Sequence, residues 1–520
     1  MRIKRYQVII VGRGLSALTT ALRLVEQGIT DILVVGPDCG ATAAIAAINF
    51  VLPDNPHGDT PKRYAEDMLR VGMGVSQEAL VREIASRSRD GFAFLSRNGV
   101  RFATEADGSL KWRHLSGHSC PRSLCKTTGL IGAEMEACLM ARLKAHGVSF
   151  VSGVCVRLLS DGMRVYGITL MEPARANEIR NVYASVVVAA WGGVGRLFPR
   201  STYPGDIDGR TLAMAYQAGA ALCDLAFVEY EPMVVPMGDR TGEPCPTAML
   251  GEGAYLLNAD HERFLLKVRP QGEAGAPKSL IISEIRKQQA LGKASPAGGC
   301  YVDLRPIPRR VLEGYPWFLR QLKRLGLDPY AGPIEVVPMP HGFSGGIKVN
   351  QFYQSTVSGL YAVGEAAGGV HGACRCAGNA ASQAVMSGLL CAEAIVAHEK
   401  LDCGSEKTFP CELRMEQSVY LAYVPRVQAL AAYAFGPCRN EGILTDALAQ
   451  LDTLLAQPPV RHDEPTQLIA LALKLILSEA LRRQESRGCH VRDDYPAADK
   501  AFERSFTWKQ ADETEPAAKD

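Results

Sequence analysis

An arginine stands alone among glycines in the stretch from Val357 to Gly388, VSGLYAVGEAAGGVHGACRCAGNAASQAVMSG. The apolar run Gly359 to Val363 predicts a buried strand, and the Ala, Ser and Met pattern from Asn379 predicts a helix. A glycine-rich loop between a strand and a helix brings unpaired backbone N–H groups and the helix dipole against an anionic or electron-rich ligand. We therefore expect this loop to hold both a bound ligand and the cation of Arg375.

The N-terminus predicts a second ligand-binding turn. Tyr6 to Val11 predicts a strand, the run Gly12-Arg13-Gly14-Leu15-Ser16-Ala17 a tight turn into a helix, and Asp31 to Val35 a second strand. In G-x-G-x-x-A the first glycine permits the turn, the second admits a pyrophosphate, and the alanine allows close helix–strand packing. Gly36 and Pro37 stand where NAD-binding folds carry an acidic residue, which disfavours NAD. A tight turn without any ligand is the alternative.

Composition excludes several classes of function. The 520 residues are 47% hydrophobic and 22% charged, with a formal net charge of +2 and scattered basic residues, so neither nucleic-acid binding nor membrane insertion is expected. The short apolar run before Gly12 is no signal peptide, which predicts a cytoplasmic protein. The 15 cysteines are irregularly spaced and lack the four-ligand pattern of zinc or iron–sulfur sites, so reduced thiols are expected.

The order of patterns predicts an α/β fold of several domains. Ala184 to Ala190 predicts a strand that returns to the first sheet, as in a two-dinucleotide-type, Rossmann-like fold, and the Pro- and Gly-rich region after Leu225 predicts an inserted α+β cap. Helical spacing follows in Leu413–Leu430, which Pro425 is expected to kink or split, and in two later segments, Ile443–Leu455 and Pro465–Gln484. The predicted parts are residues 1–225 and 350–400 for the ligand-binding domain, 226–349 for the cap, 405–510 for a helical domain and 511–520 for a disordered tail.

Several long motifs in order resemble the flavoproteins of the fumarate reductase, succinate dehydrogenase and L-aspartate oxidase family. They are VVVAAWGGVGRLF, DGRTLAMAYQAGA, GEGAYLLNADHERF, HGFSGGIKVN, GLYAVGEAAGGVHGACRCAGNAA and ESRGCHVRDDYP. The resemblance implies an FAD-binding domain split by the cap and a C-terminal helical domain. Chain length and ending are more similar to an aspartate oxidase than to a succinate dehydrogenase.

The resemblance also implies which residues bind FAD. Respiratory members attach the flavin through a histidine where this chain has Gly40-Ala41-Thr42-Ala43, so FAD is expected to be non-covalent. The positions expected to bind it are Gly12, Gly14, Leu15, Ser16, Ala17, Thr42, Ala43, Ala190, Gly192, Gly193, Asp208, Glu365, Asn379, Ala380 and Ala381.

Two motif positions match residues that hold a substrate carboxylate in this family. Arg375 in HGACR stands where HGANR-like motifs carry a carboxylate-binding arginine, and His341 matches the histidine of H-x-x-x-G-G-I. A guanidinium can grip a carboxylate with two parallel hydrogen bonds, which a lysine cannot do. The alternatives are a structural loop cation and a core histidine.

Other catalytic positions depart from the family pattern. The family motif E-F-V-Q-F-H-P contains a substrate-binding histidine, and this chain has Glu231 at that position. The family also has Thr-Glu where this chain has Pro246-Thr247, and an arginine where this chain has Leu250. The proton-donating arginine of R-D-x-x-x-R aligns with Ile281, so Arg286 or Glu231 is expected to carry the proton instead. Loss of a cation and gain of a carboxylate disfavour a substrate with two carboxylates.

The sequence therefore predicts an FAD-dependent oxidoreductase that transfers a hydride between flavin N5 and a small carboxylate-bearing substrate, by enoate reduction or by C–C or C–N dehydrogenation. The alternatives are L-aspartate oxidase and a catalytically altered subunit that passes electrons to a partner. An iron–sulfur cluster would belong to such an electron-transfer subunit. Cys374 and Cys376 flank Arg375, and we interpret them as small residues in a tight loop rather than as a redox pair.

Overall fold

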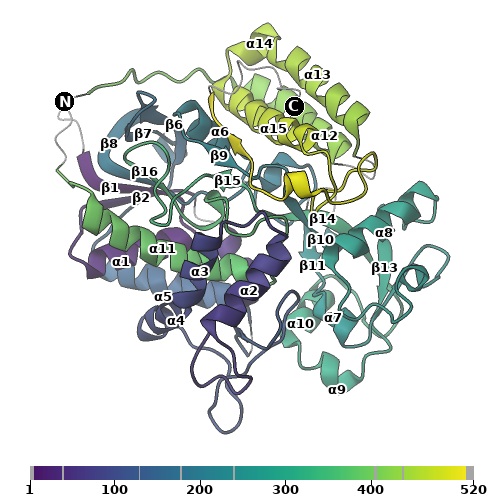
Figure 1. Ribbon diagram of the computed structural model, residues 1–520. Helices are drawn as coiled ribbons and strands as arrows, with labels where there is room; N and C mark the ends of the chain where they lie inside the picture. The colour runs from purple at the N-terminus through teal and green to yellow at the C-terminus, as the bar shows by residue number, and fades with distance from the viewer. Residues whose placement is uncertain are drawn as a thin grey trace.

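The computed structural model describes residues 5–37, 40–127, 129–175, 178–205, 207–237, 241–402, 407–435 and 439–510. Figure 1 shows a sheet with helices along one side, a smaller sheet with its own helices at one flank, and a group of helices at the top. The predicted tail, residues 511–520, lies outside the described residues.

The central sheet has seven strands in the order β5-β2-β1-β8-β7-β6, with β16 beside the C-terminal end of β8. β1, β2, β5, β8 and β16 run parallel, whereas β6 and β7 are antiparallel to their neighbours. Val8 to Val11 of β1 and all four residues of β2 are apolar and buried, as is usual in the covered strands of a parallel sheet. The strands are β1 Arg5–Val11, β2 Ile32–Val35, β5 Ser149–Val151, β6 Val154–Ser160, β7 Val165–Glu172, β8 Glu178–Ala189 and β16 Leu360–Ala362.

Helices cover one face of this sheet, where α1 packs against both α11 and α5. Among the described residues, only α11 is long and apolar enough to cross a membrane, but 72% of that window is buried in the molecule, as in a core helix. The helices of this region are α1 Leu15–Glu26, α2 Pro61–Gly72, α3 Glu78–Ser86, α4 Ser88–Arg97, α5 Ile131–Ala145, α6 Arg210–Gln217 and α11 Asn379–His398. A short antiparallel pair, β3 Ala47–Asn49 and β4 Ser123–Cys125, lies between them.

The inserted cap has its own sheet and core. Its strand order is β11-β10-β14-β13-β12, and all pairs are antiparallel. A separate hydrophobic cluster fills it, which includes Leu256, Val302, Phe318 and Val336. The elements are β10 Val228–Met237, β11 Thr241–Pro244, α7 Ala248–Gly251, β12 Tyr255–Leu257, α8 Lys278–Ala290, β13 Cys300–Asp303, α9 Arg309–Leu312, α10 Pro316–Arg324 and β14 Ile334–Phe343.

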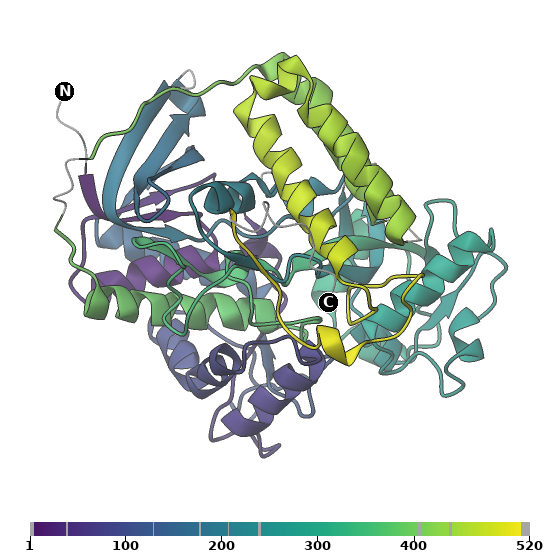
Figure 2. The ribbon, with the colours of Figure 1, turned by 45° about the horizontal axis from the view of Figure 1, so that its top comes forward.

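The C-terminal part is helical, and the segment that follows it returns across the molecule (Figure 2). Its helices are α12 Gln417–Ala434, α13 Glu441–Leu455, α14 Pro458–Arg461 and α15 Glu464–Arg482. α12 runs through Pro425 without a break, so the predicted split is wrong. β17 Thr507–Trp508 then pairs with β9 Leu222–Cys223, which also pairs with β15 Gly346–Ile347. The predicted α/β class with an inserted α+β cap and a helical C-terminal domain is confirmed, whereas the exact domain boundaries stay predictions.

A buried arginine joins the outer helices to the glycine-rich loop. Arg122 is fully buried and pairs with Asp59 at 2.8 Å and Asp67 at 2.7 Å, and its Nη1 donates to Nδ1 of His118 at 2.8 Å. Nε2 of His118 therefore carries the proton that bonds Ala377 O at 2.8 Å. Burial lowers the pKa of His118 to about 4, so the imidazole stays neutral. The imidazole of His118 therefore links Arg122 to the glycine-rich loop.

Removing this guanidinium is expected to destabilise the protein. Arg122→Met leaves the buried carboxylate of Asp59 without its cation and Asp67 with Arg70 alone, which costs about 3–5 kcal/mol of the free energy of unfolding. Arg70→Met is the matched control, because Arg70 pairs with the same Asp67 from a side chain that is 60% exposed, and its loss should cost no more than about 1 kcal/mol. Urea unfolding of both variants measures the difference, and equal costs would contradict the assignment.

Candidate active site

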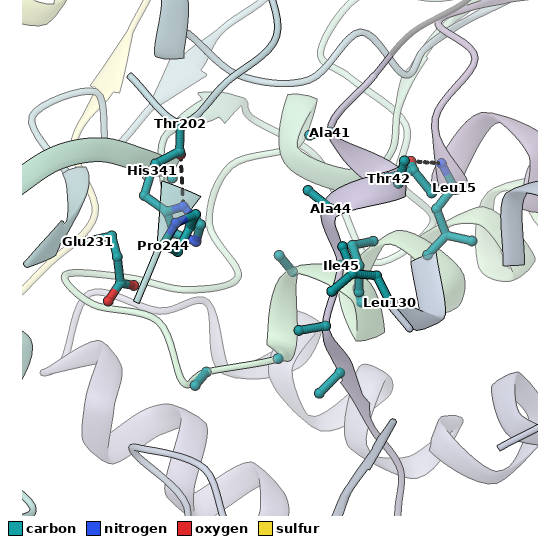
Figure 3. A pocket seen from close by; sticks show the side chains of 18 of the residues that line it. Leu15, Ala41, Thr42, Ala44, Ile45, Leu130, Thr202, Glu231, Pro244 and His341 are labelled. Carbon is teal, nitrogen blue, oxygen red and sulfur yellow. Dashed lines mark hydrogen bonds between the residues drawn. The ribbon is translucent and has the colours of Figure 1, made fainter. Parts of the chain in front are cut away.

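A cavity of about 1550 Å³ lies where the central sheet, the N-termini of α1 and α11, and the cap meet. Figure 3 shows Leu15 and Thr42 on one side and Glu231, His341 and Thr202 on the other. Small-molecule sites usually occupy about 300–1,000 Å³. The cavity is therefore large enough for an extended cofactor together with a small substrate.

The first side is built from backbone at helix N-termini. A Cβ on Gly12, which has φ +125°, would lie 2.1 Å from Ala190 O, so only glycine fits where β1 meets β8. α1 follows Gly14 with no side-chain cap and no acidic residue in its first turn, although Thr42 accepts a hydrogen bond from Leu15 N at 2.8 Å. α11 also starts without a side-chain cap, after Gly378. Uncapped helix N-termini attract anions such as a pyrophosphate.

The second side carries four alternating charges, which we call the charge network: Arg375, Glu229, Lys278 and Glu231. Arg375 donates from Nε and Nη2 to the two carboxylate oxygens of Glu229, at 3.0 and 3.1 Å. Nζ of Lys278 lies 3.1 Å from Glu229 and 2.7 Å from Glu231. All four side chains are at most 12% exposed. Two cations and two anions cancel, so the network has no net charge.

The network fixes the ionisation of Glu229 and Lys278. Burial would raise the pKa of Glu229, but Arg375 and Lys278 outweigh it and hold that pKa at about 2. Burial would likewise lower the pKa of Lys278, yet Glu231 and Glu229 raise it above its usual value. Lys278 is therefore an ammonium at neutral pH. Oε1 of Glu231 is buried without any hydrogen-bond partner in the described structure, and Glu231 lines the cavity.

His341 and Glu365 complete this side. Nδ1 of His341 lies 2.9 Å from the hydroxyl of Thr202 (Figure 3), and burial lowers the pKa of His341 to about 4, so it is neutral. Glu365, in the glycine-rich loop, accepts hydrogen bonds from the Tyr203 hydroxyl and, at 2.9 Å, from Phe343 N. Burial raises the pKa of Glu365. These bonds tie the loop to β14 and to the segment before α6.

The structure brings three of the four predicted catalytic residues together and separates the fourth. Arg375, His341 and Glu231 line the cavity. Arg286 is not among the lining residues described; it donates to Phe435 O at 3.3 Å and stacks on Tyr230.

The family's proton donor has no counterpart at the aligned position, Ile281. Ile281 is 1% exposed in the core of the cap, so no donor could act from there. The cation of the cap that enters the cavity is Lys278, three residues earlier at the start of α8. Lys278 was not predicted from the sequence, although its place directly after Pro277 at a helix start was a usable signal. Glu229 was not predicted either, although it stands two residues before Glu231.

Most predicted cofactor residues line the cavity, and four do not. Ala17 packs within α1, Asp208 pairs with Arg210, and Asn379 accepts hydrogen bonds from Tyr64 and Asn49. Gly193 lies behind Glu365, whose carboxyl carbon would be 2.9 Å from an added Cβ. The lining residues are Gly12, Gly14, Leu15, Ser16, Thr42, Ala43, Ala190, Gly192, Glu365, Ala380 and Ala381.

Comparison with known proteins decides the family. A model described as FAD binding domain matches residues 7–381, and one described as fumarate reductase flavoprotein C-term matches residues 454–519. The chain belongs to the fumarate reductase and L-aspartate oxidase family of flavoproteins. Similar proteins include an L-aspartate oxidase of Streptomyces coelicolor, 30% identical over 97% of this chain and 90% of that protein. One subunit of the fumarate reductase (CoM/CoB) of Methanothermobacter marburgensis is 27% identical, over 96% of each chain.

The fold of this flavoprotein is also found in solved structures. One is an Escherichia coli quinol fumarate reductase FrdA variant, with a TM-score of 0.83, 22% identity, and coverage of 96% of this chain and 94% of that one. The protein is an FAD-dependent oxidoreductase, as predicted, and the uncapped helix N-termini and close-approach glycines of the cavity fit the pyrophosphate of FAD. The prediction of non-covalent attachment stays a prediction; Ala41–Ala44 forms a short 3₁₀ turn at the cavity.

Charge at the start of α1 should control FAD binding. Gly14 has an extended backbone, with φ −75° and ψ −178°, and an added Cβ would meet only Thr42 Oγ1, at 3.2 Å. Gly14→Asp should therefore bind FAD several-fold more weakly than the isosteric Gly14→Asn, because a carboxylate there repels the pyrophosphate. Titration of each apoprotein with FAD, followed by flavin fluorescence, measures both dissociation constants. Equal constants would argue against a pyrophosphate at this helix end.

Proposed function

We propose that this flavoprotein dehydrogenates a small substrate with one carboxylate and a hydrogen-bond-donating or cationic group, for which an α-amino acid with an uncharged side chain is the simplest chemistry. The observation that supports this most is the neutral charge network with an unpaired oxygen on Glu231. Bound FAD supplies the hydride acceptor. The residues of this chain anchor the substrate and handle its proton.

Arg375 can still anchor one carboxylate. A guanidinium has five N–H donors, and Glu229 uses Nε–H and one Nη2–H. The edge formed by Nη1 and Nη2 is left, and it suits a second carboxylate in a bidentate arrangement. His341 adds one N–H when its other nitrogen accepts from Thr202. The predicted pair of Arg375 and His341 therefore stays our proposal for the carboxylate site.

The same network disfavours a second carboxylate. Glu229 and Glu231 already neutralise Arg375 and Lys278, so one substrate carboxylate gives the site a net negative charge. A second substrate carboxylate would lie near Glu231 and would have no cation left to pair with. Like charges repel strongly in a buried site of low dielectric. An ammonium or other donor group facing Oε1 of Glu231 instead satisfies that oxygen and balances the substrate carboxylate.

Lys278 and Glu231 are the groups placed to handle a proton. The Lys278 ammonium has three N–H donors, of which Glu229 and Glu231 take two. Oε1 of Glu231 accepts the proton that a substrate ammonium must release before its C–N bond is oxidised, and Lys278 positions Glu231 through a hydrogen bond to its other oxygen. General acid–base assistance of this kind contributes about 10²- to 10⁴-fold to a rate.

The route by which electrons leave is a second part of the proposal. Similar proteins include a solved Mycobacterium smegmatis Sdh1 complex and the Methanothermobacter protein, which is named as one subunit of its fumarate reductase. Among the described residues no cluster of His, Cys, Asp and Glu could hold a metal, so an iron–sulfur cluster in the route would sit in a partner subunit. Stopped flow measures the rate at which dioxygen reoxidises the reduced flavin. A slow rate supports such a partner, and a fast rate supports an oxidase.

Substrate charge provides the first test. Wild type should bind crotonate more tightly than fumarate, which differs by a carboxylate in place of a methyl group. Glu231→Gln should tighten fumarate binding about tenfold, or ~1.4 kcal/mol, and leave crotonate unchanged. Shifts of the flavin absorbance on titration measure all four constants, and much tighter binding of fumarate than of crotonate by wild type would overturn the proposal.

Removal of the ammonium provides the second test. In Lys278→Met, reduction of bound flavin by an amino acid that reduces the wild type should slow by about 100-fold or more, and Lys278→Arg should recover part of the rate. Lys287→Met is the control, because Lys287 lies on the same helix with a side chain that is 60% exposed. Anaerobic stopped flow measures the rates. The assignment of Lys278 fails if Lys278→Met and Lys287→Met behave alike, and the substrate class fails if no amino acid in a full panel reduces the wild-type flavin.

A further inference from the structure

Two cysteines from distant parts of the chain meet beside Arg375. Cys374 lies in the glycine-rich loop and Cys489 in the segment that follows α15. The main chain brings them together, because Cys489 N donates to Ala373 O, the residue before Cys374, at 2.9 Å. The two thiol groups are close enough for each to shift the pKa of the other. A backbone contact therefore holds the two cysteines next to each other.

Cys376, the nearer cysteine in sequence, faces elsewhere. Its side chain is buried, and its Sγ lies 3.6 Å from Gly117 O and 3.8 Å from Asp67 O. The interpretation of Cys376 as a small residue in a tight loop agrees with this environment. The thiol partner of Cys374 is Cys489, which no local spacing in the sequence indicates.

The segment that carries Cys489 is held firmly against the loop. Gly488, with φ +55°, comes so close that an added Cβ would lie 2.2 Å from Ala373 O. Next to it, Arg487 pairs with the buried Glu485 at 2.9 Å and donates to Met73 O at 2.6 Å. A disulfide requires neighbouring Cα atoms and Cβ atoms directed at each other. The backbone hydrogen bond from Cys489 to Ala373 places Cys374 and Cys489 side by side on fixed segments, so we expect a disulfide between them to need little movement.

The surroundings make Cys374 the more nucleophilic of the two. The neighbouring Cys489 thiol lowers the pKa of Cys374, and with the cations Lys278 and Arg375 it outweighs burial and Glu229, which raise it. The Cys374 thiol, together with burial, raises the pKa of Cys489. Both residues retain partial solvent exposure. A thiolate attacks a disulfide and a neighbouring thiol then resolves the mixed disulfide.

We propose that Cys374 and Cys489 are a redox-active dithiol that forms a reversible disulfide by exchange with a low-molecular-weight disulfide. The Cys374 thiolate attacks one sulfur of the small disulfide, which forms a mixed disulfide and releases one small thiolate. Cys489 loses its proton to that thiolate and attacks the Cys374 sulfur, which releases the second small thiol. The protein loses two electrons and two protons, and one small disulfide becomes two thiols. The bond ties the segment after α15 to the loop that carries Arg375.

Tryptic peptide mapping tests this disulfide directly, because trypsin places Cys374, Cys376 and Cys489 in three different peptides. Cleavage after Arg375 and Arg487 leaves Cys374 as the only cysteine of peptide 349–375 and Cys489 as the only cysteine of peptide 488–492, while Cys376 falls in peptide 376–400. The flavin-loaded protein is incubated with oxidised glutathione, the remaining thiols are alkylated, and the digest is analysed by mass spectrometry without reduction. We expect peptide 349–375 linked to peptide 488–492, and loss of the link on treatment with dithiothreitol.

Serine variants and melting temperature provide independent checks. Cys376→Ser should form the same link, whereas Cys374→Ser and Cys489→Ser should not. Oxidation should raise the melting temperature of wild type and Cys376→Ser and leave that of the other two unchanged, because only the first two gain a cross-link. The proposal is overturned if both cysteines of wild type are alkylated after oxidation, or if Cys374 stops at a glutathione adduct. None of these outcomes depends on the identity of the flavin substrate.

Discussion

The alternating charges of Arg375, Glu229, Lys278 and Glu231 are the constraint on which the account of this site depends. Each pair is within hydrogen-bonding distance, and all four side chains are almost buried. In such a place an unpaired charge costs far more than a paired one. The network therefore sets the net charge that a substrate can bring. A flavoprotein that pairs Arg375 and Lys278 with two glutamates has a different electrostatic preference from one that leaves two cations free.

The four charged residues of the network come from two domains, each with its own hydrophobic core. Glu229 and Glu231 lie on β10, and Lys278 starts α8, so three of the four come from the cap. Arg375 comes from the glycine-rich loop of the FAD-binding domain, between β16 and α11. The ion pair between Arg375 and Glu229 thus connects the two domains through the site itself. Buried ion pairs add little to stability, so we attribute its value to orientation of the site.

Local patterns were enough to predict the elements that hold FAD. The turn after β1 and the loop before α11 are continuous in sequence, so glycine spacing and strand–helix order indicate them directly. Arg375 and His341 could be predicted in the same way, because each stands in a long motif that is continuous in sequence. Lys278 was missed because it lies three residues from Ile281 on α8, and positions three apart share a helix face, so periodicity could not choose between them.

Contacts between distant segments could not be predicted from one sequence. Nothing local indicates that Glu229 bonds Arg375 or that Cys489 meets Cys374. The most direct measurement of the central claim is a crystal structure of the flavin-loaded protein with a bound α-amino acid. We predict that the substrate carboxylate lies on the Nη1–Nη2 edge of Arg375 and its amine faces Oε1 of Glu231, with the bond between Arg375 and Glu229 intact. A substrate carboxylate that displaces Glu229 from Arg375 would contradict the account.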